Sequence, residues 1–131
     1  MPDKPEPTVR KKYGTYILPS AAAHVVARVK VGQGEPLHGS DVEVEGTPVP
    51  GQIVGAEEWF ALGSAAEVDD KILQLTTVIP DAKKGDKLTV THEVHGAAEP
   101  LVIQHFYDVG AGQSGDQILM TFVDLDVEKG E

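Results

Sequence analysis

The chain has 131 residues, a formal net charge of −10 and no cysteine. This length fits one domain that buries enough apolar surface to fold without a structural metal or a disulfide, and the lack of cysteine excludes disulfide frameworks, thiolate nucleophiles and cysteine zinc sites. An acidic body repels a phosphate backbone, so we expect no nucleic-acid partner through the folded domain.

Residues 1–12 are predicted to form an extended, basic, proline-rich arm, and residues 13–131 a single β-domain. The arm has four basic and two acidic residues, whereas residues 31–70 contain nine acidic residues and no lysine or arginine. Opposite charges of this kind favour contact between the arm of one subunit and the acidic body of a neighbour. The residues expected to bind a partner are Arg10, Lys11, Lys12 and Tyr13.

The rest of the chain consists of short apolar or alternating segments separated by glycine and proline, a pattern that predicts strands. In chain order the predicted strands are 13–18, 24–31, 41–45, 52–54, 71–79, 87–95, 101–109 and 117–125. Pro48 and Pro50 indicate an edge or a connection between strands. Ser64 and Glu67 have the spacing of a capping box and predict one helical turn. Seven or eight short strands with hardly any helix predict an all-β fold, an antiparallel β-sandwich or jelly roll.

The last three predicted strands follow one another with short loops, which is typical of an antiparallel meander. Segment 117–125 is apolar on both faces at its start and then alternates Val123 and Leu125 with acidic residues. A central strand that is covered on both faces at its start and runs toward the rim of its sheet fits this pattern.

Two histidines support an alternative function in metal chemistry. If the hairpin between residues 95 and 101 places position 92 opposite position 105, His92 and His105 approach each other as in a cupin-like metal-binding enzyme. Glu93 or Glu99 would then be a further ligand. The spacing does not match the H-x-H array of that family, and histidines on a strand are more often structural.

Two other patterns in the sequence have simpler explanations. Segment 110–115 matches G-x-G-x-x-G, but a β-pattern follows it where a dinucleotide site needs a helix, so we expect a flexible turn. Trp59 is the sole tryptophan. It supports the alternative of a carbohydrate- or peptide-binding module, although a lone tryptophan is more often part of the core.

No serine lies in a nucleophile elbow, and no other catalytic motif is present. These features favour a non-catalytic structural protein of a larger assembly, without a cofactor. Its most specific form is a decoration or cement protein of a virion head, which oligomerises, for example as a trimer, and docks on a capsid shell through its N-terminal arm. That form rests on an analogy of size and architecture.

We also expect no membrane association, because no run of residues is long and apolar enough to span a bilayer. The N-terminus lacks the apolar core of a signal peptide, so we expect a soluble protein made in the cytoplasm. It would be found in the virion if the decoration hypothesis is right.

Overall fold

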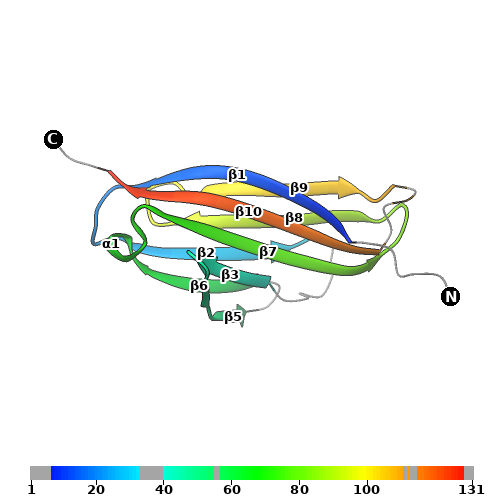
Figure 1. Cartoon of the computed structure of the whole chain (residues 1–131), viewed down its shortest axis with the longest axis horizontal. Coiled ribbons are helices and arrows are strands. Elements are labelled where there is room, and N and C mark those ends of the chain that lie inside the picture. Colours follow the sequence, from blue (N-terminus) through cyan, green and yellow to red (C-terminus); the bar gives the residue numbers. More distant parts are fainter. Residues whose placement is uncertain (1–6, 33–39, 55–56, 111, 113–114, 129–131) are drawn as a thin grey trace.

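The computed structural model describes residues 7–32, 40–54, 57–110, 112 and 115–128. Within these ranges the chain forms ten strands and one helix of four residues, arranged as two five-stranded sheets. The predicted all-β class is therefore confirmed. The long strands run along the long axis of the molecule, and the helix lies at one end (Figure 1).

The first sheet, here called the β10 sheet, has the strand order β1-β10-β7-β3-β4. Its strands are β1 (Thr8–Leu18), β10 (Gly115–Val127), β7 (Lys71–Ala82), β3 (Ser40–Val44) and β4 (Thr47–Val49). The second sheet, here called the β8 sheet, has the order β5-β6-β2-β8-β9. Its strands are β5 (Gly51–Val54), β6 (Glu57–Ser64), β2 (His24–Val31), β8 (Lys87–His95) and β9 (Leu101–Asp108). Helix α1 (Ala65–Val68) joins β6 to β7.

One hydrophobic core receives side chains from both sheets. Strand β2 begins and ends where the alternation predicts, and its buried residues are the four predicted to face inward, Val25, Ala27, Val29 and Val31. Buried leucines on β7 and β10 contribute from the other sheet. Since side chains along a strand alternate between its two faces, each sheet has one face in the core and one outer face.

The segment predicted as an arm enters the sheet earlier than expected. Residues 8–12 belong to β1, which pairs in parallel with β10 along its whole length, from Thr8 opposite Gln117 to Leu18 opposite Val127. This ladder satisfies the backbone of the basic segment inside the domain. It also makes the β10 sheet mixed, whereas the sequence pattern predicts antiparallel pairing. Residues 1–6 lie outside the described ranges.

The predicted meander of the last three strands is wrong. Strands β8 and β9 pair antiparallel, but β10 lies in the other sheet, between β1 and β7. A short loop is compatible with a return in the same sheet and with a crossing to the facing sheet, so loop length alone does not decide between them. The expectation that β10 is a central strand is confirmed.

Most of the predicted edge, helix-cap and strand-end signals are confirmed. Pro48 lies in the edge strand β4, as expected. Ser64 caps α1, because its Oγ accepts a hydrogen bond from the Glu67 backbone at 3.3 Å while its own N–H donates to Glu67 Oε1 at 3.0 Å. Strand β7 is an exception, since it continues through Pro80 to Ala82 instead of ending before the proline.

Candidate interaction surface

The outer face of the β10 sheet, here called the outer β10 face, presents large apolar side chains to solvent. At its centre the ring of Tyr13 stacks on that of Phe122, with centroids 5.4 Å apart and planes 17° from parallel. Tyr13 is 72 % exposed. The register brings together apolar side chains from three strands, namely Val9, Tyr13, Ile17, Ile72, Val78, Ile118, Met120 and Phe122. Apolar side chains that gather on one exposed face are typical of an interaction site.

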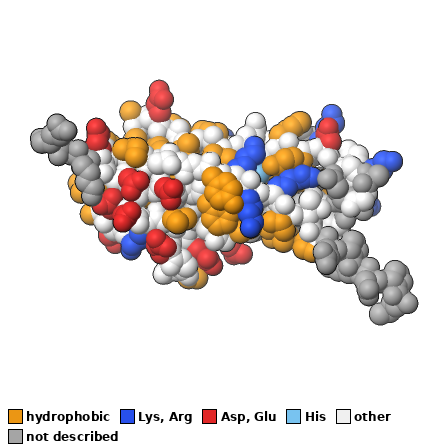
Figure 2. Space-filling view, turned by 45° about the horizontal axis from the view of Figure 1, so that its top comes forward, with side chains coloured by type: hydrophobic (Ala, Val, Ile, Leu, Met, Phe, Trp, Pro, Cys, Tyr) orange, Lys and Arg blue, Asp and Glu red, His pale blue; other side chains and the backbone are white. Residues whose placement is uncertain are grey.

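Charges of opposite sign flank this apolar centre. Lys11 lies toward the start of β1, whereas Asp124 and Asp126 lie toward the end of β10. Together with Glu45 and Asp70, the two aspartates line a hollow of about 330 Å³. In the part of the chain that the structure describes, Lys11, Asp124 and Asp126 form no ion pair. Figure 2 shows acidic side chains gathered toward one end, lysine and arginine toward the other, and large apolar groups between them.

The sheet edges are protected against pairing with a further strand. Strands β1 and β9 are the outermost strands of their sheets, and Lys12 Nζ crosses between them to donate to the Gln104 carbonyl at 2.7 Å. The Tyr16 hydroxyl donates to the Glu99 carbonyl at 2.8 Å and accepts from the Ala97 N–H at 2.9 Å. On the opposite edges, β4 and β5 have three and four residues. A lysine across an edge and very short edge strands both disfavour strand addition.

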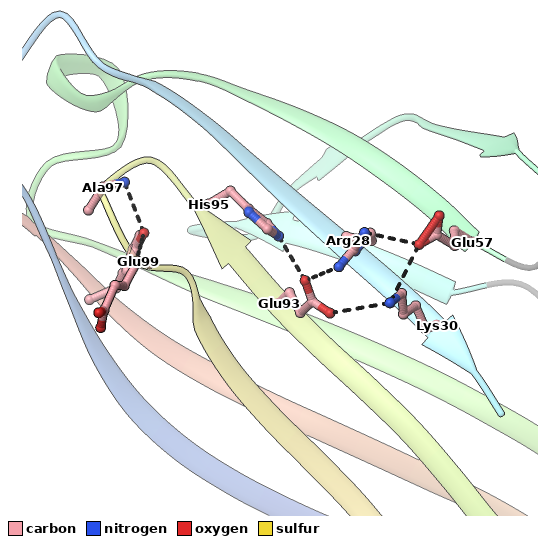
Figure 3. Close-up of polar contacts among 8 residues, drawn as sticks. Arg28, Lys30, Glu57, Glu93, His95, Ala97 and Glu99 are labelled. Atoms are coloured by element: carbon pink, nitrogen blue, oxygen red, sulfur yellow. Dashed lines mark hydrogen bonds and ion pairs between the residues drawn. The ribbon is translucent and has the colours of Figure 1, made fainter.

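The outer face of the β8 sheet, here called the outer β8 face, also exposes two large apolar side chains on β9, Val102 and Phe106. It differs from the outer β10 face in its charges, which neutralise one another (Figure 3). Arg28 on β2 contacts Glu57 on β6 at 3.0 Å and also hydrogen-bonds to Glu93 on β8. Lys30 lies 3.8 Å from Glu57 and 4.0 Å from Glu93. His95 Nε2 lies 2.8 Å from Glu93 Oε1. We call these five residues the Arg28 cluster.

The Arg28 cluster keeps Glu93 ionised although this residue is only 5 % exposed. Burial raises the pKa of the Glu93 carboxyl, but hydrogen bonds from His95 and Arg28 and the charges of Arg28 and Lys30 outweigh that effect. The pKa of Glu93 therefore lies below its usual value, which is the expected result for a carboxylate that accepts charged hydrogen bonds.

Trp59, the candidate for sugar or peptide stacking, lies half-buried on the outer β8 face. Its ring centroid is 4.8 Å from the Arg28 guanidinium and 5.9 Å from the centroid of the His95 ring. The protein's own cation therefore occupies the π-system that a ligand would use.

The two histidines of the metal hypothesis meet inside the core, but not in the predicted register. His92 pairs with Ile103 and His105 with Val90, so the rings are diagonal neighbours, with centroids 5.2 Å apart. Thr121 on β10 lies between them, its hydroxyl 2.7 Å from His92 Nδ1 and 2.9 Å from His105 Nε2. A hydroxyl has one proton, so it donates to one ring and accepts from the other.

Further hydroxyls extend this buried polar chain in both directions. Thr77 Oγ1 lies 2.9 Å from His92 Nε2 and 2.8 Å from Ser40 Oγ. At the other end, the Tyr107 hydroxyl lies 3.5 Å from His105 Nδ1. Each ring nitrogen thus has a hydroxyl neighbour, and these contacts connect the two sheets across the core.

Both histidines are neutral at physiological pH. Burial, with a smaller contribution from His105, lowers the pKa of His92 to about 3. Burial, with a smaller contribution from the charge of Lys12, lowers the pKa of His105 to about 4. A neutral pair held by threonine hydroxyls is what a satisfied core requires. Among the described residues, no group of three or more His, Cys, Asp or Glu is arranged to hold a metal ion.

The four residues predicted to bind a partner divide into two pairs. Arg10 places its guanidinium 4.1 Å from the centroid of the Tyr107 ring, and Lys12 bonds to the Gln104 carbonyl, so both contact β9. Lys11 and Tyr13 alternate with them and lie on the outer β10 face.

The apolar residues of β10 are the part of this surface that the sequence interpretation missed. Ile118 and Met120 gave a signal, because together with Leu119 they make the first half of the strand apolar on both faces. The same pattern is typical of a strand that its own chain covers on both faces. Nothing in the sequence distinguishes a face covered by the same chain from a face available to a partner.

Comparisons with protein-family models, with curated proteins and with solved structures found no match for this chain. Among the described residues, no helix has the length and apolar character needed to cross a membrane.

Proposed function

We propose that the chain is a non-catalytic module of a larger protein assembly and that it associates through the outer β10 face. The observation that carries this proposal is the stack of the exposed Tyr13 ring on the partly buried Phe122, in the middle of an apolar face. Burial of apolar surface on a partner is favourable by about 25 cal/mol per Å². Aromatic anchors at the centre of a contact contribute most of its energy.

The charges on the same face favour a protein partner. A polyanion such as nucleic acid would be repelled by Asp124, Asp126 and the carboxylates around them. A protein surface, in contrast, can offer an apolar centre with a charge of the required sign at each end. Lys11 and the two aspartates then orient the partner, while the apolar centre provides affinity.

A β-sandwich is the finer architecture that we propose for the two sheets, because their buried side chains enter one core. Such an architecture presents a broad, rigid face, and it hosts many unrelated binding and structural functions. The fold therefore supports a module that acts by contact, and the choice of partner depends on the surface residues.

A decoration or cement protein of a virion head is the most specific form of this proposal. In that form Lys11 and Tyr13 contact a neighbouring subunit of the decoration protein, while Arg10 and Lys12 hold β1 against β9. Cosedimentation of the chain with assembled shells, with and without the Tyr13→Glu substitution, tests it. Equal cosedimentation of both chains would contradict this form.

Native mass spectrometry of the purified chain tests the general function, because it reports subunit number and bound metal together. We expect oligomers without stoichiometric metal, which Tyr13→Glu reduces. The matched control is Gln104→Glu, which places the same new charge at an exposed position on the outer β8 face. A monomer that carries one transition-metal ion would overturn the proposal in favour of a site at His92 and His105.

A further inference from the structure

The outer β10 face has a direction along its strands. Because β1 and β10 run parallel, Lys11 near the start of one strand and Asp124 near the end of the other lie on opposite sides of the Tyr13–Phe122 stack. In register, Lys11 is one row before the stack and Asp124 one row after it, where a row is two residues along the strand. The face therefore presents a basic end, an apolar centre and an acidic end.

We infer that the occupant of this face is a second copy of the chain, related to the first by a two-fold axis that passes near the aromatic stack. This inference rests on the proposed function, since it names the partner of the same face. Two copies that use one face make an isologous contact, in which every pair of residues occurs twice. The Lys11 side chain of each copy then contacts the acidic end of the other copy.

Charge decides how the strands of the two copies run relative to each other. If the strands run in the same direction, the two acidic ends meet, with Asp124 and Asp126 against their own equivalents. If they run antiparallel, the basic end of each copy covers the acidic end of the other. Sheets that pack face to face cross at about 30° because of their twist, and a long lysine side chain accommodates that angle.

The acidic end contains a hollow that is lined mostly by acidic residues. The hollow of about 330 Å³ is lined by the carboxylates of Glu45, Asp70, Asp124 and Asp126 and by Lys71. An ammonium group from the partner would enter a site with an excess of carboxylates. The net charge of −10 on each copy opposes association at long range, so an orientation that pairs opposite ends is strongly preferred over one that does not.

The size of the face is sufficient for a stable dimer. Strands β1, β10 and β7 have 11, 13 and 12 residues, and at about 3.3 Å per residue and about 4.8 Å per strand these three give a flat area of roughly 550 Å². Projecting side chains make the accessible area larger than the flat area. The accessible area of the face is then on the order of the 800 Å² that each partner contributes to a standard interface.

Charge reversal tests the two-fold pairing directly. In Lys11→Glu the new glutamate meets Asp124 of the other copy, and in Asp124→Lys the new lysine meets Lys11, in both cases twice per dimer. We expect each single variant to raise the dimer dissociation constant at least about tenfold at low ionic strength, as close interfacial charge pairs do. Sedimentation equilibrium measures this change.

The decisive samples are a 1:1 mixture of the two single variants and the double variant Lys11→Glu/Asp124→Lys. In a mixed dimer, the glutamate introduced in one copy meets the lysine introduced in the other, and the remaining contact pairs the native Lys11 with the native Asp124. We expect both samples to recover dimers with a dissociation constant within a few-fold of the unmodified chain. Recovery by mixing is a signature that a merely structural role for either residue would not give.

Two results overturn the inference, and they differ in what they mean for the proposed function. If the unmodified chain stays monomeric at high concentration, a second copy is not the occupant, and the face is left to a partner of different sequence. If Tyr13→Glu breaks the oligomer but neither the mixture nor the double variant recovers it, association through the face stands and the antiparallel two-fold pairing is wrong.

Discussion

The two outer faces of this protein both carry charges and use them in opposite ways. On the outer β8 face, Arg28 and Glu93 satisfy each other, and the Arg28 guanidinium covers the Trp59 ring. On the outer β10 face, Lys11 and Asp124 are separated by an apolar centre. Charges that are paired within one face gain little from a partner. Charges that an apolar centre keeps apart can form new ion pairs when a complementary surface binds. On this difference in charge we base the proposal that the protein associates through the outer β10 face.

The largest effect on the free energy of unfolding is expected from His92 and His105, which lie in the core between the two faces. Above pH 6.5, His92 and His105 are neutral in the folded and the unfolded chain. As the pH falls below 6.5, both histidines bind protons in the unfolded chain. In the folded chain they stay neutral until the pH approaches about 4 for His105 and about 3 for His92. Stability is therefore lost on acidification, by up to about 1.4 kcal/mol per pH unit for each histidine.

Urea denaturation at pH 7 and at pH 5 measures this loss, which we expect to reach up to about 4 kcal/mol. Other charged or titratable groups near the pair are Lys12 on β1 and Tyr107 on β9. Substitution of His92 by glutamine should reduce the pH dependence, and substitution of the exposed His24 should leave it unchanged. Equal pH dependence in all three chains would contradict the account.

The next largest effect is expected for Thr121→Val, which keeps the volume of the side chain and removes its hydroxyl. His92 and His105 then each lose a buried hydrogen-bond partner, and an unsatisfied buried polar group costs about 1–3 kcal/mol. We expect a loss of about 3 kcal/mol in the free energy of unfolding. Thermal or urea denaturation at pH 7 checks this value, and a loss below about 1 kcal/mol would show that the hydroxyl does not bridge the rings.

A matched pair of carboxylate substitutions compares the two faces directly. Glu93→Ala removes the acceptor of Arg28 and His95, so we expect a loss of about 1–3 kcal/mol. Asp124→Ala removes an exposed carboxylate without an ion pair among the described residues and should change the free energy of unfolding by less than about 0.5 kcal/mol. Urea denaturation at a concentration that keeps the chain monomeric measures both values. Similar losses for the two variants would remove the distinction between the faces.

The smallest effect is expected from removing single hydroxyls along β1. Tyr16→Phe deletes the group that joins the Glu99 carbonyl and the Ala97 N–H, at an expected cost of about 1 kcal/mol. Tyr13→Phe makes the same chemical change on the outer β10 face and should leave the stability of the monomer unchanged. Differential scanning calorimetry resolves the two, and the reverse order would contradict the assignment of Tyr13 to association.

The sequence predicts most strands of this fold because their causes are local. Strand β2 alternates cleanly and is bounded by turn residues, and Ser64 with Glu67 forms a capping box, so both are read from neighbouring residues alone. The parallel pairing of β1 with β10 joins segments more than a hundred residues apart. No local pattern encodes such a partner, so the sequence predicts an arm for the basic segment.

The candidate surface was predictable in part. Lys11 and Tyr13 were singled out by their place in a basic segment, and they do face outward. Ile118 and Met120 on β10 are predicted to be covered, because burial by the same chain and burial by a partner leave the same hydrophobic pattern. The diagonal approach of His92 and His105 depends on the register between β8 and β9. A shift of one residue would turn one of the two rings to the other face of the sheet.

Thiol labelling tests the central claim, that the protein associates through the outer β10 face, most directly. The chain has no cysteine, so Thr15→Cys places a single thiol on that face and Gln104→Cys places one on the other. The account predicts that labelling of Thr15→Cys slows as the protein concentration rises, while labelling of Gln104→Cys keeps its rate. Slowing confined to the Gln104→Cys chain would contradict the account, because it would place the contact on the outer β8 face.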